Sequence, residues 1–333
     1  MLTSADLESI LTAIPRLRIA VLGDLFLDRY LDIDPALTEP SVETGLEAYQ
    51  VVCVRSFPGA AGTVINNLAA LGVGTICVIS VIGDDGEGYE LRQALARMPA
   101  VHADRLITHP DRHTPTYTKP MLGNRELNRL DIKNRAPLSA SAQAEVLRSL
   151  ENCWPGLDAL VIVDQVSEPE CGVVTEPTRR LVSELAQRDP KVAVADSRER
   201  IGRFENVMLK PNERETLAAV EGAKDVTAAA MVLARRAGRT VFCTRGERGI
   251  LVAEPHDAEP TGVPAFPVLG PIDSVGAGDS TSAAIACALA ASASQVTAAA
   301  FGNLVASITV RQIGTTGTAT PAQIRRRWHE VND

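Results

Sequence analysis

Two carboxylates flank a flexible turn in the stretch Asp273–Asp279, which reads DSVGAGD and leads into a long series of small residues. Gly276, Ala277 and Gly278 form the turn, and the residues after it predict a buried helix from Asp279 to about residue 291. The amides of the turn and of the first helical turn have no partner inside a helix. Together with the helix dipole, they form a site for an anion.

Asp279 would lie next to that anion, and this position suggests its chemistry. A carboxylate beside a bound anion is unfavourable unless it acts, for example as a general base that takes a proton from a hydroxyl group. The helix amides would then stabilise negative charge on the group under attack. Phosphoryl transfer to an alcohol combines these two features. The simpler alternative is that Asp279 only caps the helix.

A second pair of carboxylates, Asp24 and Asp28, follows the first predicted strand, Arg18–Gly23. A dinucleotide-binding protein would have G-x-G-x-x-G at this point for a pyrophosphate, which two carboxylates would repel. Ionised carboxylates accept hydrogen bonds from hydroxyl groups, so this pair favours a polyol ligand. The alternative for either residue is the cap of a turn or loop.

The stretch Pro58–Thr63, PGAAGT, also consists of small residues and precedes a helical pattern. Small residues at the start of a helix let a ligand approach the backbone closely. Close packing of the helix against its neighbours explains this composition equally well.

Strands and helices alternate along the chain and must position these residues. The apolar runs typical of buried strands are Arg18–Gly23, Thr75–Ile82, Asp158–Asp164, Lys191–Asp196, Val207–Lys210 and Thr240–Thr244. The helical patterns are Thr63–Leu71, Gly86–Arg97, Ser141–Leu150, Thr178–Arg188 and Val226–Ala237. This alternation predicts an α/β fold with a mainly parallel central sheet that helices cover on both faces. Ligands of such sheets lie beyond the carboxyl ends of the strands.

Two segments, about 30–57 and 112–134, interrupt this pattern with alternating polar and apolar residues. Within the second, Tyr117–Leu122 and Glu126–Lys133 are typical of antiparallel strands. We expect a small β-sheet lid inserted into a single domain of residues 1–333, although ordinary edge strands would show the same pattern. An exposed lid would bury its apolar face most simply against a second copy, which predicts a homodimer.

The composition argues against several classes of protein. The net charge is −8, aromatic residues make up 4%, and there is no dense basic block, which argues against nucleic-acid binding. No apolar run approaches the roughly 18–20 residues of a membrane span, and the N-terminus lacks a secretory pattern. The six cysteines form no C-x-x-C pair and the five histidines have no metal-binding spacing. We therefore expect reduced thiols in a cytoplasmic protein.

The stretch Asp273–Asp279 resembles the D-[ST]-x-G-A-G-D signature of the ribokinase/PfkB family of carbohydrate kinases. Other family features occur in the same order between about residues 18 and 322: the early Gly-rich helix start, GDD followed by Gly88, Asn212 with Glu215, and Thr244 with Gly246 and Gly249. Within the family, VLGDLFLDRY, TKPMLGNRELNRLD and the late GTTGT are most similar to heptose-7-phosphate kinases. The resemblance implies a ribokinase-like three-layer fold, and the length implies a stand-alone kinase without a fused nucleotidyltransferase domain.

The same resemblance implies ATP-dependent phosphorylation of a sugar or sugar phosphate, with magnesium and, in many members, potassium. Asp279 would be the general base, and Gly276, Ala277 and Gly278 the anion hole. The implied nucleotide contacts are Asn212 and Glu215 at the phosphates and water-bound magnesium, Thr244, Gly246 and Gly249 along the nucleotide, and Asn303 near the adenine. The implied substrate contacts are Asp24, Asp28, Gly59 and Thr63, with Lys119 and Arg129 of the lid at an anionic group of the sugar. Asp273 and residues 309–316 would hold the monovalent cation.

The sequence departs from the family pattern around the substrate. Pro58 stands where the family usually has the first of two glycines, and Thr63 where an Asn contacts the sugar. Asp196-Ser197-Arg198 replaces a common D-P-K, and LTEPSVETGLEAYQVV is only loosely similar to the acidic lid segment of heptose kinases. A non-catalytic sugar- or nucleotide-binding member of the fold, or a kinase for a nucleoside or fructose phosphate, therefore stays open. A nucleotide-dependent oxidoreductase is disfavoured because G-x-G-x-x-G is missing.

Overall fold

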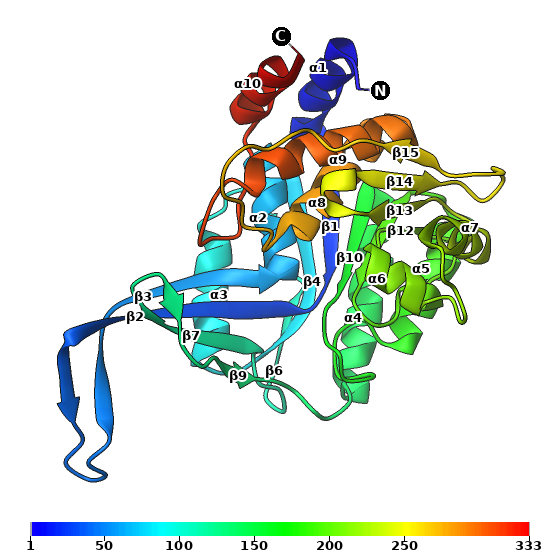
Figure 1. Ribbon diagram of the computed structural model, residues 1–333. Helices are drawn as coiled ribbons and strands as arrows, with labels where there is room; N and C mark the ends of the chain where they lie inside the picture. The colour runs from blue at the N-terminus through cyan, green and yellow to red at the C-terminus, as the bar shows by residue number, and fades with distance from the viewer. Residues whose placement is uncertain (1, 333) are drawn as a thin grey trace.

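A mainly parallel sheet forms the centre of the molecule. Figure 1 shows the computed structural model, in which residues 2–332 are described. The strand order is β15-β14-β13-β12-β11-β10-β1-β4-β5, with β6 beside β4, and β14 pairs antiparallel with both β13 and β15 while the other described pairs are parallel. The strands are β1 (Arg18–Gly23), β4 (Thr75–Gly83), β5 (Val101–His102), β6 (Leu106–His109), β10 (Ala159–Asp164), β11 (Val192–Ser197), β12 (Met208–Leu209), β13 (Val241–Thr244), β14 (Ile250–Ala253) and β15 (Thr261–Val263).

Helices cover both faces of this sheet, so the predicted three-layer α/β architecture is confirmed. Ile19 and Val21 of β1 belong to one hydrophobic core, and their neighbours Ala20 and Leu22 belong to the other. The first core includes side chains of α1 (Ser4–Ala13), α2 (Ala61–Leu71), α3 (Gly86–Ala96), α8 (Ala277–Ala290), α9 (Gln295–Thr309) and α10 (Pro321–Asn332). The second core is covered by α4 (Ala140–Cys153), α5 (Glu176–Arg188), the short α6 (Glu213–Ala218) and α7 (Val226–Ala237).

Helix α8 is made almost entirely of small side chains and is buried along nearly its whole length. It packs between α2 and α9, and every residue from Ser280 to Leu289 is buried. Alanine and serine allow such close approach because they fill little space between helices. At Gly302 of α9, even a methyl group would come within 3.1 Å of Ile285. The helix that starts at the Gly-Ala-Gly turn is therefore held firmly from both sides.

A second, smaller sheet projects from this body. Its order is β3-β2-β7-β8, with β9 beside β7, and β2 pairs antiparallel with β3 but parallel with β7. The strands are β2 (Leu25–Pro40), β3 (Glu47–Ala60), β7 (Thr116–Leu122), β8 (Arg125–Glu126) and β9 (Leu130–Ile132). Figure 1 shows the β2–β3 hairpin extending away from the main sheet. The two lid segments thus form a separate sheet, and the first is longer than the predicted 30–57 because β2 begins directly after Asp24.

Four short 3-10 helices complete the described elements, at Ile14–Arg16, Trp154–Gly156, Ile201–Arg203 and Gly246–Arg248. The first and last helices lie together (Figure 1), where Arg325 of α10 forms an ion pair of 2.8 Å with Glu8 of α1. Within residues 2–332, no helix combines the length and the apolar character that crossing a bilayer requires.

Ala60 joins the lid to α2 in a strained backbone conformation. Its φ is +52° and its ψ is −116°, a combination that favours glycine. We expect Ala60→Gly to raise the free energy of unfolding by about 1 kcal/mol, because strain relief outweighs the added entropy of the unfolded chain. Urea unfolding measures the change. The neighbouring Ala61→Gly, at the first residue of the regular helix, should instead lower the free energy of unfolding by up to about 1 kcal/mol, and equal losses in both variants would contradict the strain.

Candidate active site

The Gly-Ala-Gly turn begins α8 in a conformation that only its first glycine accommodates easily. Gly276 is the N-cap residue, with a φ of +78°. The amide of Ala277 donates to the carbonyl of Ser274 at 3.2 Å, so it is already used within the turn. The amides of Gly278 and Asp279 have no acceptor among residues 2–332. The expected anion hole stays a prediction: the amides of Gly278 and Asp279 are free to donate, while the amide of Ala277 stabilises the turn.

Asp279 stands at this helix start with an unusually weak acid group. Burial, followed by the negative charge of Asp196, raises its pKa from 3.8 to about 7. The positive charges of Lys210 and Arg198 act in the opposite direction, and Asp28 adds a further small increase. A carboxylate with this pKa exchanges its proton near neutral pH, as a general base requires.

A buried ion pair supports the start of α8. Lys210 Nζ lies 2.9 Å from Asp196 Oδ2, and Ser282 of α8 donates to the same oxygen at 2.9 Å. Because β11 ends beside Asp196 and β12 ends just before Lys210, the carboxyl edge of the sheet positions both charges. The sequence pattern did not identify Lys210 as a site residue, although a lysine at the end of an apolar strand was a usable signal.

On the lid side, Asp28, Gly59 and Lys119 lie together as expected. Lys119 Nζ is 3.4 Å from Asp28 Oδ1 and donates to the Tyr30 hydroxyl at 3.1 Å. A methyl group at Gly59 would come within 2.5 Å of the Asp28 carboxylate, so only glycine leaves that carboxylate in its place. Burial alone would lower the pKa of Lys119, but Asp28 raises it above its ordinary value, so the lysine stays charged.

Arg129 lies on the outer part of the lid. Its guanidinium is 4.0 Å from the centre of the Tyr117 ring and forms an ion pair of 2.6 Å with Asp131. Arg129 is exposed, whereas Thr63 is buried against the turn, its methyl group 3.4 Å from where a side chain of Gly276 would begin. This burial favours a packing role for Thr63 over the expected contact with a sugar.

Asp24 points into the protein interior and holds a loop, which is the alternative considered from the sequence. Its carboxylate accepts hydrogen bonds from the backbone amides of Gln165 at 3.1 Å, Val166 at 3.2 Å and Val173 at 2.7 Å. Only 3% of its surface is exposed, and burial, with the charge of Asp164, raises its pKa to about 6. This geometry favours the loop-holding role for Asp24, the sugar contact stays a prediction, and Asp28 is the carboxylate of the lid.

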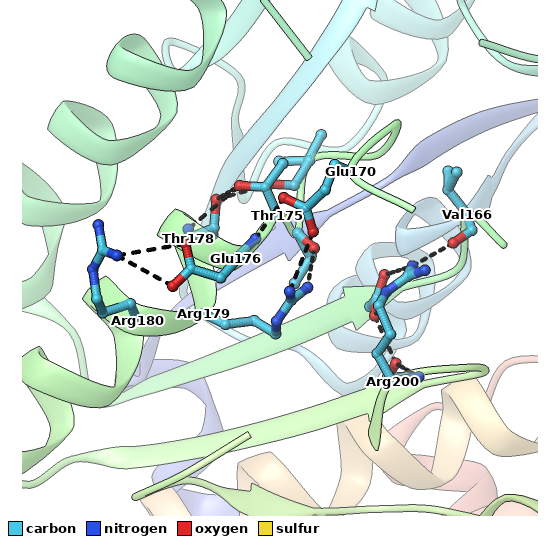
Figure 2. A network of polar contacts seen from close by, with 12 residues as sticks. Val166, Glu170, Thr175, Glu176, Thr178, Arg179, Arg180 and Arg200 are labelled. Carbon is cyan, nitrogen blue, oxygen red and sulfur yellow. Dashed lines mark hydrogen bonds and ion pairs between the residues drawn. The ribbon is translucent and has the colours of Figure 1, made fainter. Parts of the chain in front are cut away.

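The loop that Asp24 holds is fixed by two buried arginines as well. Arg200 donates to Asp164 at 3.0 Å and to the carbonyl of Val166, and Arg179 donates to Glu170 at 3.2 Å (Figure 2). Residues 165–168 of this loop line a small cavity together with side chains of the lid, among them Phe26, Tyr117, Lys133 and Asn134. The loop therefore presents a rigid wall to the lid.

Asn212 and Glu215 close the N-terminus of α6 with reciprocal hydrogen bonds. Asn212 Oδ1 accepts from the amide of Glu215 at 2.9 Å, and Glu215 Oε2 accepts from the amide of Asn212 at 2.8 Å. Burial is the main cause that raises the pKa of Glu215, and Asp196 adds to it. A bridge to Asn212 places Thr244 beside this helix start. The structure thus brings the three residues together, and the cap uses one oxygen of Glu215.

Gly246, Gly249 and Asn303 lie around the β13–β14 turn. Gly249 has a φ of +79°, and a methyl group there would come within 2.1 Å of the carbonyl of Val263. Asn303 of α9 donates to that same carbonyl at 3.1 Å and to the carbonyl of Pro264 at 3.0 Å. Both residues therefore have packing roles at the end of β15, besides the nucleotide contact that the resemblance implies.

Asp273 connects its turn to the segment after α9. Its Oδ1 accepts from the amide of Val275 at 3.0 Å and its Oδ2 from the amide of Gly314 at 3.0 Å, while its own amide donates to Val310. The expected proximity of Asp273 to residues 309–316 is thus present. No group of three or more His, Cys, Asp or Glu residues with metal-binding geometry occurs between residues 2 and 332. The cysteines are free thiols.

Curated proteins with similar sequences span a longer chain than this one. The bifunctional protein HldE of Pelobacter propionicus is 31% identical over 328 residues, which cover 96% of this chain and 64% of that protein. HldE of Trichlorobacter lovleyi is 30% identical over 324 residues, with 95% and 64% covered. The chain therefore spans 64% of the length of these two relatives.

Solved structures share the fold at low sequence identity. Phosphofructokinase-2 of Escherichia coli in complex with fructose-6-phosphate superposes with a TM-score of 0.72 at 20% identity, covering 95% of this chain and 100% of that one. Ribokinase of Arabidopsis thaliana complexed with ribose and ATP gives 0.68 at 16% identity, covering 93% and 98%. These likenesses confirm the ribokinase-like fold. Residues 27–323 match the model of the pfkB family carbohydrate kinases, and the chain belongs to that family.

Proposed function

We propose that the protein transfers the γ-phosphoryl group of ATP to a hydroxyl group of a sugar or sugar phosphate. The observation that carries this proposal is Asp279, a carboxylate with a pKa near 7 beside two free amides at the start of α8. Asp196 and, more weakly, Asp28 of the lid act together with burial to raise the pKa of Asp279. Family membership supports the reaction class.

In the proposed reaction, Asp28 accepts hydrogen bonds from sugar hydroxyls and fixes the sugar against Gly59 and the lid. Asp279 removes the proton from the hydroxyl that attacks the phosphorus atom. The amides of Gly278 and Asp279 donate to the phosphoryl oxygens as charge develops on them. The chain contributes mainly position and charge, as is usual in phosphoryl transfer.

Magnesium would neutralise phosphate charge when bound with ATP. Glu215 fits a magnesium-bound water because its cap occupies only Oε2 and leaves Oε1 without a partner among the described residues. Both oxygens of Asp273, the residue proposed for potassium, already accept backbone amides, so a cation there would share these oxygens with the turn. Comparison of rates in potassium and sodium tests that part separately.

The substrate class follows from charges on the lid and from the relatives. Lys119 and Arg129 can meet an anionic group on a sugar, although each already pairs with a carboxylate. The similarity of the lid sequence to heptose-7-phosphate kinases points the same way. A sugar that already carries a phosphate is therefore the first acceptor to test, followed by free sugars, fructose phosphate and nucleosides.

An ADP-release assay with ATP, magnesium and potassium tests the proposal across that panel. We expect one sugar or sugar phosphate to stimulate ADP release well above the rate with ATP alone. A panel without any active acceptor, from a protein that still binds ATP or a sugar, would favour the non-catalytic alternative.

The pH dependence of kcat/KM follows from the pKa of Asp279. Its carboxylate must be ionised to accept a proton, so activity should be full above pH 7 and fall about tenfold per unit below it. Initial rates at subsaturating acceptor, measured from pH 5 to 9, give the apparent pKa of the acid limb. An apparent pKa near 4, the ordinary value of a carboxyl group, would contradict the environment described for Asp279.

The lid also supports the proposal of a homodimer. Its hairpin leaves large apolar side chains exposed, including Val42, Leu46, Val52 and Val54, with exposed fractions of 97%, 71%, 58% and 56%. Apolar groups gathered on one protruding sheet are typical of an interface. Sedimentation velocity at micromolar concentration should show a dimer, and Val54→Asp should dissociate it. A wild-type monomer would end the proposal.

A further inference from the structure

A pocket with several positive charges lies where α10 packs against the end of α9. Its volume is about 240 Å³, somewhat below the roughly 300–1,000 Å³ of typical ligand pockets, so it suits a compact ligand. We call it the α9–α10 pocket. Its charged and amide side chains are Arg311, Gln312, Gln323, Arg326, Arg327 and Glu330. The proposed phosphoryl transfer gives none of these side chains a role.

Three guanidinium groups share a single carboxylate in this pocket. Arg311 Nη1 lies 3.5 Å and Arg327 Nη1 lies 3.2 Å from the same oxygen, Glu330 Oε2. The third guanidinium, that of Arg326, has no acceptor among residues 2–332. The lining therefore carries an excess of positive charge, although the whole chain has a net charge of −8. Such a local reversal of charge favours an anion at this place.

Two of the donor groups around the pocket are held in place by the protein. Arg327 is buried, its Nε donates to the Ser307 hydroxyl at 3.1 Å, and its guanidinium also donates to the carbonyl of Pro267. Gln323 Oε1 accepts from the amide of Thr320 at 2.8 Å, which caps the start of α10. The Nε2 group of Gln323 has no acceptor among the described residues. The pocket thus has a rigid wall with hydrogen-bond donors to spare.

A phosphate group matches this set of donors better than other small anions. The planar guanidinium group binds pairs of phosphate oxygens in a bidentate manner. A carboxylate has only two oxygens and would leave several of the donors unused. Potassium, which we placed near Asp273, would be repelled by the three arginines, so this pocket is distinct from the proposed cation site.

The pocket also borders a loop that packs against the Gly-Ala-Gly turn. Gln312 donates to the carbonyl of Thr318 at 2.6 Å and accepts from its amide at 3.2 Å, which closes residues 312–318 into a loop. Within this loop, Thr316 would lie 3.2 Å from a methyl group built on Gly276. A ligand that binds beside Gln312 would therefore stabilise a loop that supports the start of α8.

We propose that the α9–α10 pocket binds a phosphate group, of inorganic phosphate or of a small phosphate monoester, through Arg311, Arg326 and Arg327. The pocket shares no side chain with the groups proposed to carry out phosphoryl transfer, so this inference stands independently of the proposed activity. The competing explanation is that the arginines form an ordinary solvated surface and only balance Glu330.

Calorimetry with inorganic phosphate and with glycerol 3-phosphate, at constant ionic strength and without nucleotide, tests the site. We expect the double variant Arg311→Gln/Arg326→Gln to bind at least about tenfold more weakly than the wild-type protein, since charge-assisted hydrogen bonds are lost. Both side chains are exposed, so the variant should fold, which urea unfolding verifies. The matched control, Arg325→Gln, removes the same charge from the adjacent residue of α10, which pairs with Glu8, and should stay within about twofold.

Hydrogen exchange of the backbone amides shows where the ligand binds. Phosphate should slow the exchange of residues 308–318 in the wild-type protein and not in the double variant. Slower exchange only at the start of α8 would place the phosphate in the candidate active site and overturn the inference.

The affinities decide the remaining alternatives. Equal binding by the wild-type protein and the double variant, or no binding of either probe, would overturn the inference. An equal loss in Arg325→Gln would also overturn it, because it would show a general effect of net charge. Tighter binding of glycerol 3-phosphate would support the site and identify an organic phosphate as its ligand, and tighter binding of inorganic phosphate would support it with the free ion as its ligand.

Discussion

Asp279→Asn is expected to lower kcat by about 10²–10⁴-fold, the usual contribution of a positioned general base. The amide has nearly the same shape as the carboxylate but does not take the proton from the attacking hydroxyl. The free amides of Gly278 and Asp279 are backbone groups and stay in place, so KM for ATP should change little. The ADP-release assay with the best acceptor gives both constants.

The same substitution should make the protein more stable, by an amount that depends on pH. Asp279 has a pKa of about 7 in the folded protein against 3.8 as its model value. The folded state therefore holds the proton more tightly than the unfolded state, and the cost of the carboxylate grows as pH rises from about 4 to 7. At pH 8 the Asn variant should gain about 1–3 kcal/mol, and at pH 5 clearly less.

The exposed Asp257 supplies the control for both effects, and Asp257→Asn should leave activity and stability unchanged. Urea unfolding at pH 5 and pH 8 measures the stabilities. An Asp279→Asn protein that retains its kcat would exclude this residue as the base. An equal gain at both pH values would show that the gain has another origin than the ionised carboxylate.

Gly249→Ala should destabilise the protein by about 3 kcal/mol or more, since a backbone clash adds to an unfavourable φ. Its Cβ would lie 2.1 Å from the carbonyl oxygen of Val263 and 2.6 Å from the amide nitrogen of Ala265. The end of β15 would have to move, and with it the carbonyl groups that Asn303 binds. Urea unfolding gives the loss of stability directly.

Gly238→Ala is the matched control for the backbone conformation alone. Gly238 ends α7 with a φ of +66°, and nothing lies within 4 Å of a methyl group built there. We expect a loss of only about 1 kcal/mol from the left-handed conformation. If both variants lose the same amount, the close approach at Gly249 is relieved by a small shift and does not determine the fold.

The central sheet could be predicted because its strands are apolar throughout and bounded by polar residues. β1 begins and ends as predicted, at Arg18–Gly23, and so does α7, at Val226–Ala237. Helix α9 was not predicted from the sequence, because small and apolar residues fill Gln295–Thr309 without a clear polar face. β14 and β15 are short, and their positions depend on the pairing with β13, which no local pattern reveals.

The family motifs allowed candidate site residues to be named from the sequence. The environment of each side chain could not be predicted, because burial and long-range contacts determine it. Asp24 and Asp28 look alike in the sequence, but long-range contacts separate them: Asp24 binds amides more than 140 residues away, and Asp28 faces the lid. The same holds for Ala277. Its amide donates to the carbonyl of Ser274 within the turn, a hydrogen bond that no sequence pattern reveals. Lys210 stands two residues before Asn212 in LKPN, yet its partner Asp196 comes from another strand.

The close packing of α8 has a consequence for how this enzyme family can change over time. Every residue from Ser280 to Leu289 in the helix behind Asp279 is buried, and even a methyl group at Gly302 of α9 would come within 3.1 Å of Ile285. The outer part of the lid hairpin, in contrast, carries exposed side chains such as Val42, Leu46 and Val52, where substitution disturbs little else. We therefore expect substitutions to be tolerated more readily in the exposed part of the lid than in the helix behind Asp279.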